Sequence, residues 1–250
     1  MALYRYVKDT HPQVRQYVQW VSYCALACGM LLLFWAFYPI ISFEIYSRFF
    51  LSRSITSPTP QTMGESTEGF SRNVLGSSTK YSNNLRDFTH ASIWFPSAAK
   101  VVSTASLPSQ EYSIAIPKLN ISDAKVKLGG EDLSQSLVHY QPVSLPGTVG
   151  NTVIFGHSTL PQLYNPKDYK TIFTYLPSLT EGDVIRVTVQ NTEYEYRVKN
   201  MFVVKPDQVS VLDQVNDRSI LTLVTCVPPG TYWNRLVVRA ELQTSNDTSL

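Results

Sequence analysis

This chain has little charge and no visible repeats, and each shortage argues against a class of protein. Charged residues make up 16% of the 250 and the net charge is +2. A wholly disordered chain would have a higher net charge, so the composition favours a folded protein. From Glu111 onward acidic and basic residues nearly balance, so no basic stripe indicates a nucleic-acid partner. Because no long internal repeat is present, a solenoid or a propeller is disfavoured.

Acidic residues with the spacing of metal ligands are also lacking. Glu131, Asp132, Glu181 and Asp183 are scattered and form no recognisable ligand set. No metal site and no cofactor are therefore predicted, and calcium dependence is left open.

The N-terminal segment lacks charge altogether. Residues 16–43 contain no Asp, Glu, Lys or Arg, and at about 1.5 Å per helical residue they exceed the roughly 30 Å hydrocarbon core of a bilayer. Aromatic residues near both ends are of the kind found at membrane interfaces, and Pro39 is expected to kink or end the helix. A cleaved signal peptide would have a shorter apolar region and a small-residue cleavage site. The segment is therefore predicted to be an uncleaved membrane anchor.

The flanks of this anchor predict its orientation. Three basic residues precede it, whereas two basic residues together with Glu44 follow it. The bias predicts a cytoplasmic N-terminus, residues 1–15, with the remaining chain on the outer side of the plasma membrane after a single pass.

Residues 44–109 separate the anchor from the folded domain. From residue 52 this segment is rich in Ser and Thr with scattered Pro, Gly and Asn, which predicts a tether. Ile93, Trp94 and Phe95 are the apolar exception, and the alternative is a short element that docks on the folded domain or covers its cleft. Residues 243–250 form a short polar tail.

Residues 110–242 show almost no helical spacing and are predicted to form an all-β domain. Glu193–Lys199 alternates charged residues with apolar bulk, and with Val184–Val189 and the intervening Asn191 and Thr192 it predicts a hairpin. Several strands within about 130 residues indicate a small β-barrel or sandwich. The expected strands are Tyr112–Ile116, Asn151–Phe155, Val184–Gln190, Glu193–Asn200, Met201–Lys205, Ile220–Cys226 and Arg235–Leu242.

Cysteine is scarce, with three residues in the chain. Cys24 and Cys28 lie one helical turn apart in the anchor, where helix packing is the simplest role and lipidation the alternative. Cys226 is left as the only cysteine outside that segment. Free cysteine is most often a buried packing residue, but this thiol ends an apolar run and precedes a Pro-Pro-Gly loop, where functional groups concentrate.

Arg235 begins the next apolar run after Cys226. Only eight residues join the two runs, so antiparallel pairing is the simplest arrangement and places Cys226 beside Arg235. Nearby positive charge lowers the pKa of a thiol and favours the reactive thiolate. Cys226 is therefore a candidate nucleophile.

Of the four histidines, two fall outside the predicted β domain. His157 follows the apolar run that begins at Asn151, so it also lies where a predicted strand ends. His139 lacks such a boundary and is expected to be structural. His157 is the candidate base that partners Cys226.

These residues together resemble the sortases, a family of bacterial cysteine transpeptidases. Thr222-Leu-Val-Thr-Cys226 matches the T-L-x-T-C motif of the family, Arg235 stands where sortases place their arginine, and Val153-Ile-Phe-Gly-His157 matches a segment ending in Gly-His. The resemblance runs over about residues 112 to 242, roughly half the chain. Further similarity covers Ile116-Pro-Lys-Leu, Leu145-Pro-Gly-Thr-Val-Gly-Asn151 and Val209-Ser-Val-Leu212.

The resemblance implies a closed eight-stranded β-barrel behind one N-terminal transmembrane helix, and a reaction at its rim. Cys226 would attack the carbonyl between Thr and Gly of a C-terminal sorting signal like Leu-Pro-x-Thr-Gly, giving a thioacyl enzyme. His157 would protonate the leaving amine and later deprotonate the incoming one, while Arg235 would hold the oxyanion or the substrate backbone. Thr225 is a candidate substrate contact, with an ordinary strand residue as the equal alternative.

The implied partners are secreted proteins that carry such a signal and an amine acceptor, either a cell-wall precursor or a pilin lysine. Pilin-polymerising sortases often have an Asp-Pro-aromatic lid before the barrel and a second membrane segment after it. Here Asp87-Phe88 lacks the proline and the tail is short and polar, so a pilin polymerase is disfavoured. Ser144-Leu-Pro-Gly-Thr148 resembles a sorting signal but lacks the apolar and basic segments that should follow, so it is predicted to be a loop.

Two other functions stay open at this point. The first is a non-catalytic, membrane-tethered β-domain for binding or scaffolding, in which Cys226 only packs. The second is a cysteine hydrolase, which would pass the acyl group to water rather than to an amine.

Overall fold

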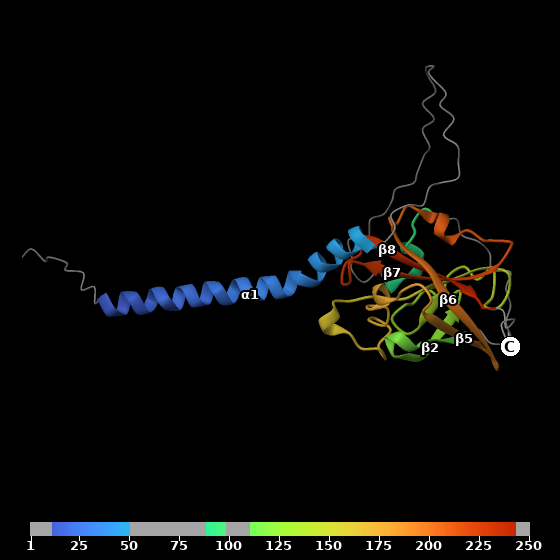
Figure 1. Ribbon diagram of the computed structural model, residues 1–250, viewed down its shortest axis with the longest axis horizontal. Coiled ribbons are helices and arrows are strands. Elements are labelled where there is room, and N and C mark those ends of the chain that lie inside the picture. The colour runs from blue at the N-terminus through green and yellow to red at the C-terminus, as the bar shows by residue number, and fades with distance from the viewer. Residues whose placement is uncertain (1–11, 51–88, 99–110, 244–250) are drawn as a thin grey trace, which may run out of the picture. The chain divides into compact units, whose positions relative to one another are not determined.

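The computed structural model describes residues 12–50, 89–98 and 111–243 (Figure 1). The chain divides into two compact units, Met1–Ser42 and Phe43–Leu250. Most of the predicted cytoplasmic N-terminus, most of the predicted tether and nearly all of the polar tail lie outside the described residues.

The N-terminal apolar segment forms the long helix α1 (Pro12–Phe50). Of the two effects expected of Pro39, a kink or an end, the helix does not show the second, because it continues past this proline. Residues 44–50, which the prediction assigned to the tether, are helical. A proline removes one main-chain donor, yet the turn that follows is supported by Ser42 Oγ, which donates to the Pro39 carbonyl over 3.1 Å. Among the described residues, Gln16–Ser47 is the one helical stretch long and apolar enough to cross a bilayer.

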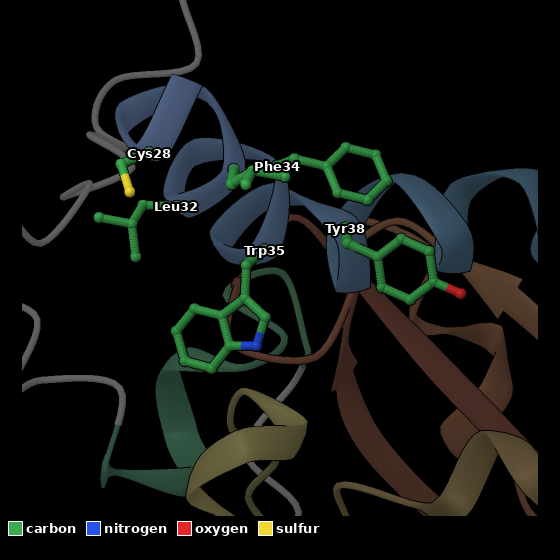
Figure 2. A pocket seen from close by; sticks show the side chains of 6 residues that line it. Cys28, Leu32, Phe34, Trp35 and Tyr38 are labelled. Carbon is green, nitrogen blue, oxygen red and sulfur yellow. The ribbon is translucent and has the colours of Figure 1, made fainter. Parts of the chain in front are cut away.

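The side chains of α1 create an apolar depression on the helix itself. Cys28, Trp35 and their neighbours follow the spacing of three, four and seven residues that places side chains on one helix face (Figure 2). Large apolar side chains along this helix are mostly exposed, which fits contact with lipid tails. The residues that line the depression are Cys28, Leu31, Leu32, Phe34, Trp35 and Tyr38.

The second unit is a closed barrel of eight strands, as predicted. Around the barrel the order is β1-β2-β3-β4-β7-β8-β6-β5, and the pairing of β5 with β1 closes it. The pairs β2–β3 and β4–β7 are parallel, and the other six pairs are antiparallel. The strands are β1 (Glu111–Ile116), β2 (Ile121–Leu128), β3 (Leu137–His139), β4 (Gly150–Phe155), β5 (Val184–Val189), β6 (Thr192–Val204), β7 (Ser219–Val227) and β8 (Asn234–Leu242).

The individual strands differ from the prediction in two respects. The two predicted strands Glu193–Asn200 and Met201–Lys205 form one strand, β6, which ends at Val204 and whose register against β8 shifts between Val198 and Asn200. A bulge of this kind interrupts the alternation of side chains without ending the strand. Strands β2 and β3 were not predicted, because β2 buries its residues irregularly and all three residues of β3 are buried.

Alternation along β7 separates two apolar clusters. Leu221, Leu223 and Val227 belong to the cluster that fills the barrel, whereas Val224 and Cys226 belong to a second cluster on the outer face. The sequence therefore places the thiol outside the barrel core, on a face that other segments cover.

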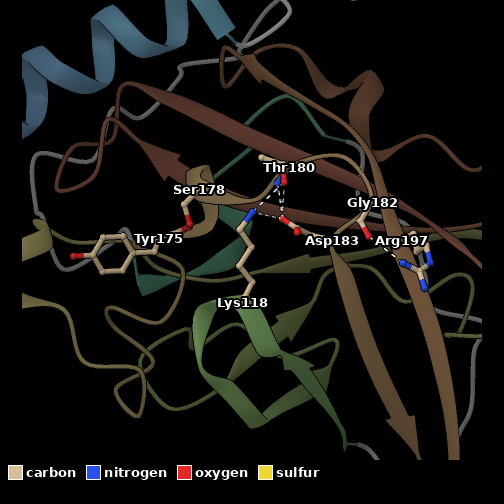
Figure 3. Close-up of polar contacts among 7 residues, drawn as sticks. All are labelled: Lys118, Tyr175, Ser178, Thr180, Gly182, Asp183 and Arg197. Carbon is tan, nitrogen blue, oxygen red and sulfur yellow. Dashed lines mark hydrogen bonds and ion pairs between the residues drawn. The ribbon is translucent and has the colours of Figure 1, made fainter.

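Polar contacts connect the turn after β1 to the loop before β5 (Figure 3). Lys118 lies in the 3₁₀ turn η3 (Pro117–Leu119), and its Nζ is 2.7 Å from Asp183 Oδ2 and 3.0 Å from Thr180 Oγ1. The Thr180 amide donates to the same carboxylate over 2.6 Å, and Arg197 on β6 donates to the Gly182 carbonyl. The contacts are exposed, so they contribute local order rather than much stability.

Candidate active site

Cys226 and Arg235 are directly opposite each other in the antiparallel pair of β7 and β8. This confirms the arrangement predicted from the short connection between the two runs. Both side chains are 1% exposed, and both lie on the outer face of the barrel, where residues of a register pair share one side of the sheet.

His157 reaches the same end of the sheet through strand β4. This strand pairs in parallel with β7, with Phe155 opposite Val224, and the Gly156 amide donates to the Val224 carbonyl over 3.1 Å. Continuing this register by two residues carries His157 to the level of Cys226. The structure thus brings the three predicted residues, Cys226 and Arg235 on strands and His157 on the loop after β4, to one end of the barrel's outer face.

Thr225 is fully buried, and its hydroxyl donates to the Gly156 carbonyl over 2.7 Å. It alternates with Cys226 along β7 and so faces the barrel interior. A substrate contact by this residue stays a prediction, and the bond to Gly156 was not expected from the sequence.

His139 lies in β3 and is fully buried. Its Nδ1 is 3.1 Å from the Tyr112 hydroxyl, and the two rings meet edge to face. Burial lowers the pKa of His139 to about 3, so the imidazole is neutral at neutral pH. This is the structural environment that the sequence indicated for it.

Residues 89–98 dock on the outer face and cover the site. The Trp94 ring stacks on Phe155, with ring centres 5.2 Å apart and planes 11° apart, and lies 5.6 Å from the ring of His157 at a tilt of 55°. Trp94 is fully buried, and Phe95 is 1% exposed. These residues therefore form the docked element that was the alternative to a simple tether.

The docked segment is joined to the loop before β3. The Ala91 amide donates to the Glu131 carbonyl and the Leu133 amide donates to the Thr89 carbonyl, both over 2.9 Å. The Ser92 amide donates to the Glu131 carboxylate over 3.1 Å. These bonds hold the short 3₁₀ turn η2 (Ala91–Ile93), which precedes Trp94.

The Arg235 guanidinium is held by carbonyl oxygens and by an aromatic face. Its Nη1 donates to the carbonyls of Tyr232 and Asn234, and its Nη2 donates to the Trp94 carbonyl over 3.1 Å. Its Cζ lies 5.4 Å from the centre of the Trp94 ring, within the range of a cation–π contact. Among the described residues, Nε of Arg235 has no hydrogen-bond partner, so a donor is available to a bound oxygen.

Burial keeps the thiol and the imidazole uncharged in this covered state. It raises the pKa of Cys226, an effect that the charge of Arg235 partly opposes. It lowers the pKa of His157 to about 4; Lys170 reinforces this effect, whereas Asp132 and Asp168 oppose it. The Nε2 atom of His157 is also buried without a partner among the described residues. Removing the cover would move both pKa values towards their usual ranges.

Two contributions to the site were not predicted from the sequence. The Trp94 carbonyl approaches Arg235 across 141 positions, and only the apolar cluster around Trp94 in a polar segment could have drawn attention to it. Ser158 donates from Oγ to the Cys226 carbonyl over 2.6 Å, and a single serine after a histidine carries no signal. Within the described parts of the chain, no group of three or more His, Cys, Asp or Glu side chains could hold a metal ion.

Comparison with known proteins identifies the family. The family model described as Sortase domain matches residues 114–243, slightly more than half of the chain. The chain therefore belongs to the sortase family.

Two curated relatives are both named Sortase A. Sortase A of Streptococcus agalactiae serotype III is 28% identical over 163 residues, which cover 61% of this chain and 64% of the relative. Sortase A of Listeria monocytogenes serovar 1/2a is 27% identical over 168 residues, covering 64% and 71% of the two chains. The match thus spans less than two thirds of the streptococcal relative's length.

Similar solved structures include a sortase A and a sortase C. Sortase A from Corynebacterium diphtheriae, a lid mutant, is 31% identical, with a TM-score of 0.45 and coverage of 59% of this chain and 77% of that one. The pilus-related sortase C of Group B Streptococcus is 25% identical, with a TM-score of 0.49 and coverage of 64% and 84%.

Proposed function

We propose that this protein is a membrane-anchored cysteine transpeptidase that cleaves a C-terminal sorting signal resembling Leu-Pro-x-Thr-Gly. The observation that carries the proposal is the register pair of Cys226 and Arg235, with His157 two residues beyond the end of the neighbouring strand β4. A thiol, a base and a fixed cation at one rim are the groups that acyl transfer through a thioester requires.

The reaction has two stages. His157 takes the proton of the Cys226 thiol as Sγ bonds to the carbonyl carbon of the Thr residue, and it gives this proton to the leaving amine as the C–N bond to Gly breaks. An incoming amine then attacks the thioester carbonyl carbon, the C–S bond breaks, and His157 passes a proton from the amine to the leaving thiolate. Arg235 donates to the carbonyl oxygen as negative charge develops there, a contribution of about 3 kcal/mol to the transition state.

The Trp94 contact supports the role given to Arg235. A main-chain carbonyl oxygen already accepts from Nη2 in the covered state, so this guanidinium is placed to hold a carbonyl of an extended peptide. Residues 89–98 would have to leave before a sorting signal could bind, since Trp94 covers both Arg235 and His157.

The anchor and the partners complete the proposal. Gln16–Ser47 would cross the plasma membrane once, with the N-terminus in the cytoplasm and the barrel outside. The donor substrates would be secreted proteins that bear the sorting signal. The acceptor would be an amine of a cell-wall precursor or of a pilin lysine.

A non-catalytic binding domain is the second candidate, because Cys226 is 1% exposed and packs within an apolar cluster. The test uses the full chain in detergent with a quenched Leu-Pro-x-Thr-Gly peptide, with and without oligoglycine. We expect cleavage by the parent and none by Cys226→Ala. Oligoglycine should divert product from the acid to the amide, and acid alone would indicate a hydrolase. Equal cleavage by Cys226→Ala, or no cleavage together with an unreactive thiol, would exclude the enzyme.

A further inference from the structure

Two side-chain hydroxyls join the loop that carries His157 to the end of β7 that carries Cys226, and the two bonds cross. Thr225 Oγ1 donates to the Gly156 carbonyl over 2.7 Å. In the other direction, Ser158 Oγ donates to the Cys226 carbonyl over 2.6 Å. Thr225, which precedes the nucleophile, is thus bonded to Gly156, which precedes His157. Ser158, which follows His157, is bonded to the nucleophile Cys226 itself.

These bonds lie where the main-chain ladder between β4 and β7 stops. The last register pair is Phe155 with Val224, followed by the bond from the Gly156 amide to the Val224 carbonyl. Ladder bonds form with almost any side chain, whereas a hydroxyl bond depends on the residue present. Beyond the Gly156 amide, the two side-chain bonds between the strand ends therefore depend on which residues stand at positions 158 and 225.

Other contacts fix the His157 loop to a different part of the barrel. The Phe173 amide donates to the His157 carbonyl over 2.9 Å, and the Thr159 amide donates to Thr174 Oγ1 over 3.0 Å. These bonds restrain the loop towards residues 171–174. They do not act on the distance between the loop and Cys226, which depends on the contacts of the loop with β7.

We propose that Ser158 and Thr225 are positioning residues, whose crossed hydroxyl bonds set the distance and orientation of the His157 imidazole relative to the Cys226 thiol. The inference rests on the proposed thiol–imidazole chemistry. Proton transfer between the two groups needs a well-defined geometry, and a misplacement of about 1 Å costs on the order of 100-fold in rate.

The test compares Ser158→Ala and Thr225→Val in the full chain. Each change is expected to lower kcat by about 10- to 100-fold and to leave KM within about twofold, because the hydroxyls hold the reacting groups rather than the substrate. Ser158→Thr and Thr225→Ser keep a hydroxyl and should recover most of kcat.

Two matched controls remove hydroxyl contacts elsewhere on β7. Ser219→Ala deletes the contact with the Tyr196 hydroxyl at the far end of the strand, and Thr222→Val deletes a buried bond to Asn151 Oδ1. We expect both to retain the kcat of the parent, even where they lower the melting temperature.

The inference is overturned if the controls lose as much kcat as the test variants, if the conservative variants fail to rescue, or if KM rises while kcat is unchanged. A parent that cleaves no peptide would refute the proposed function instead. In that case the rate of Cys226 alkylation at pH 7 tests the positioning role. The rate should fall in Ser158→Ala and Thr225→Val but not in the controls, and unchanged rates would overturn the inference.

Discussion

Arg235 donates from Nη2 to the main-chain carbonyl of Trp94 over 3.1 Å, and its Cζ lies 5.4 Å from the centre of the Trp94 ring. The guanidinium that is proposed to hold a substrate carbonyl therefore already holds a carbonyl of its own chain. Because Trp94 also packs on His157, the segment that carries Trp94 contacts two of the three proposed catalytic residues. We therefore expect that a substrate gains access only when this segment is released.

Trp94→Ala should expose the thiol. The change removes the stacking of the indole on Phe155, and an aromatic pair is worth about 1 kcal/mol beyond its buried area. Losing that much would raise the open population by roughly fivefold, and the rate of Cys226 alkylation with it. The measurement is mass-spectrometric labelling at pH 7. Trp233→Ala is the control, since Trp233 is 63% exposed, and equal labelling of all three proteins would count against a covering role.

Acid should destabilise the barrel through its two buried histidines. Burial lowers the pKa of His157 from 6.5 to about 4, so below pH 6.5 the unfolded chain binds a proton that the folded chain refuses. The free energy of unfolding therefore falls as the pH falls from about 6.5 to 4, by roughly 3 kcal/mol for His157 alone.

His139 adds to this loss, because its folded pKa of about 3 lies further below its usual value of 6.5. Urea denaturation at pH 7 and at pH 4.5 measures the effect. His139→Gln should show a smaller difference between the two pH values than the parent. A parent that is equally stable at both would contradict the burial of these rings.

Gly156→Ala should damage both stability and activity. A methyl group at this position would lie 2.5 Å from Phe173 Cδ2 and 2.6 Å from Leu137 Cδ2, so the loop that carries His157 would have to shift. Overpacking of a core costs about 1 to 3 kcal/mol. Thermal unfolding and peptide cleavage measure the two effects. Gly130→Ala, where the nearest atom is 3.4 Å away, should change neither.

Arg235→Lys should lose turnover by about 100-fold or more. Lysine keeps the charge but lacks the planar set of donors that reaches Tyr232, Asn234 and Trp94 together. Steady-state cleavage of the peptide measures the loss. Arg218→Lys, at an exposed ion pair with Glu241, is the matched control and should keep full activity. Parent-like turnover of Arg235→Lys would remove this residue from the mechanism.

The strands that could be predicted are those whose burial alternates along the chain, such as β5, and those that form longer apolar runs, such as β4 and β7. In β5 every second residue is buried, and the β5–β6 hairpin was located to within one residue: Val189 pairs with Thr192, which leaves Gln190 and Asn191 in the turn. The three residues of β3 are buried on both faces, so no alternation marks them. Pairs formed by parallel strands, such as β4 with β7, leave no local pattern at all.

The sequence by itself determined which groups are candidates for the chemistry: one thiol at the end of an apolar run, an arginine at the start of the next, and a histidine where a third run ends. It also determined that Cys226 meets Arg235, because a short connection between two strands leaves few other pairings. The tertiary structure alone decided that His157 reaches the same rim and that the hydroxyls of Thr225 and Ser158 join the two strand ends. It also decided that Trp94 covers Arg235 and His157. Those contacts join residues 68 to 141 positions apart. Their formation depends on closure of the whole barrel, which no local pattern of residues specifies.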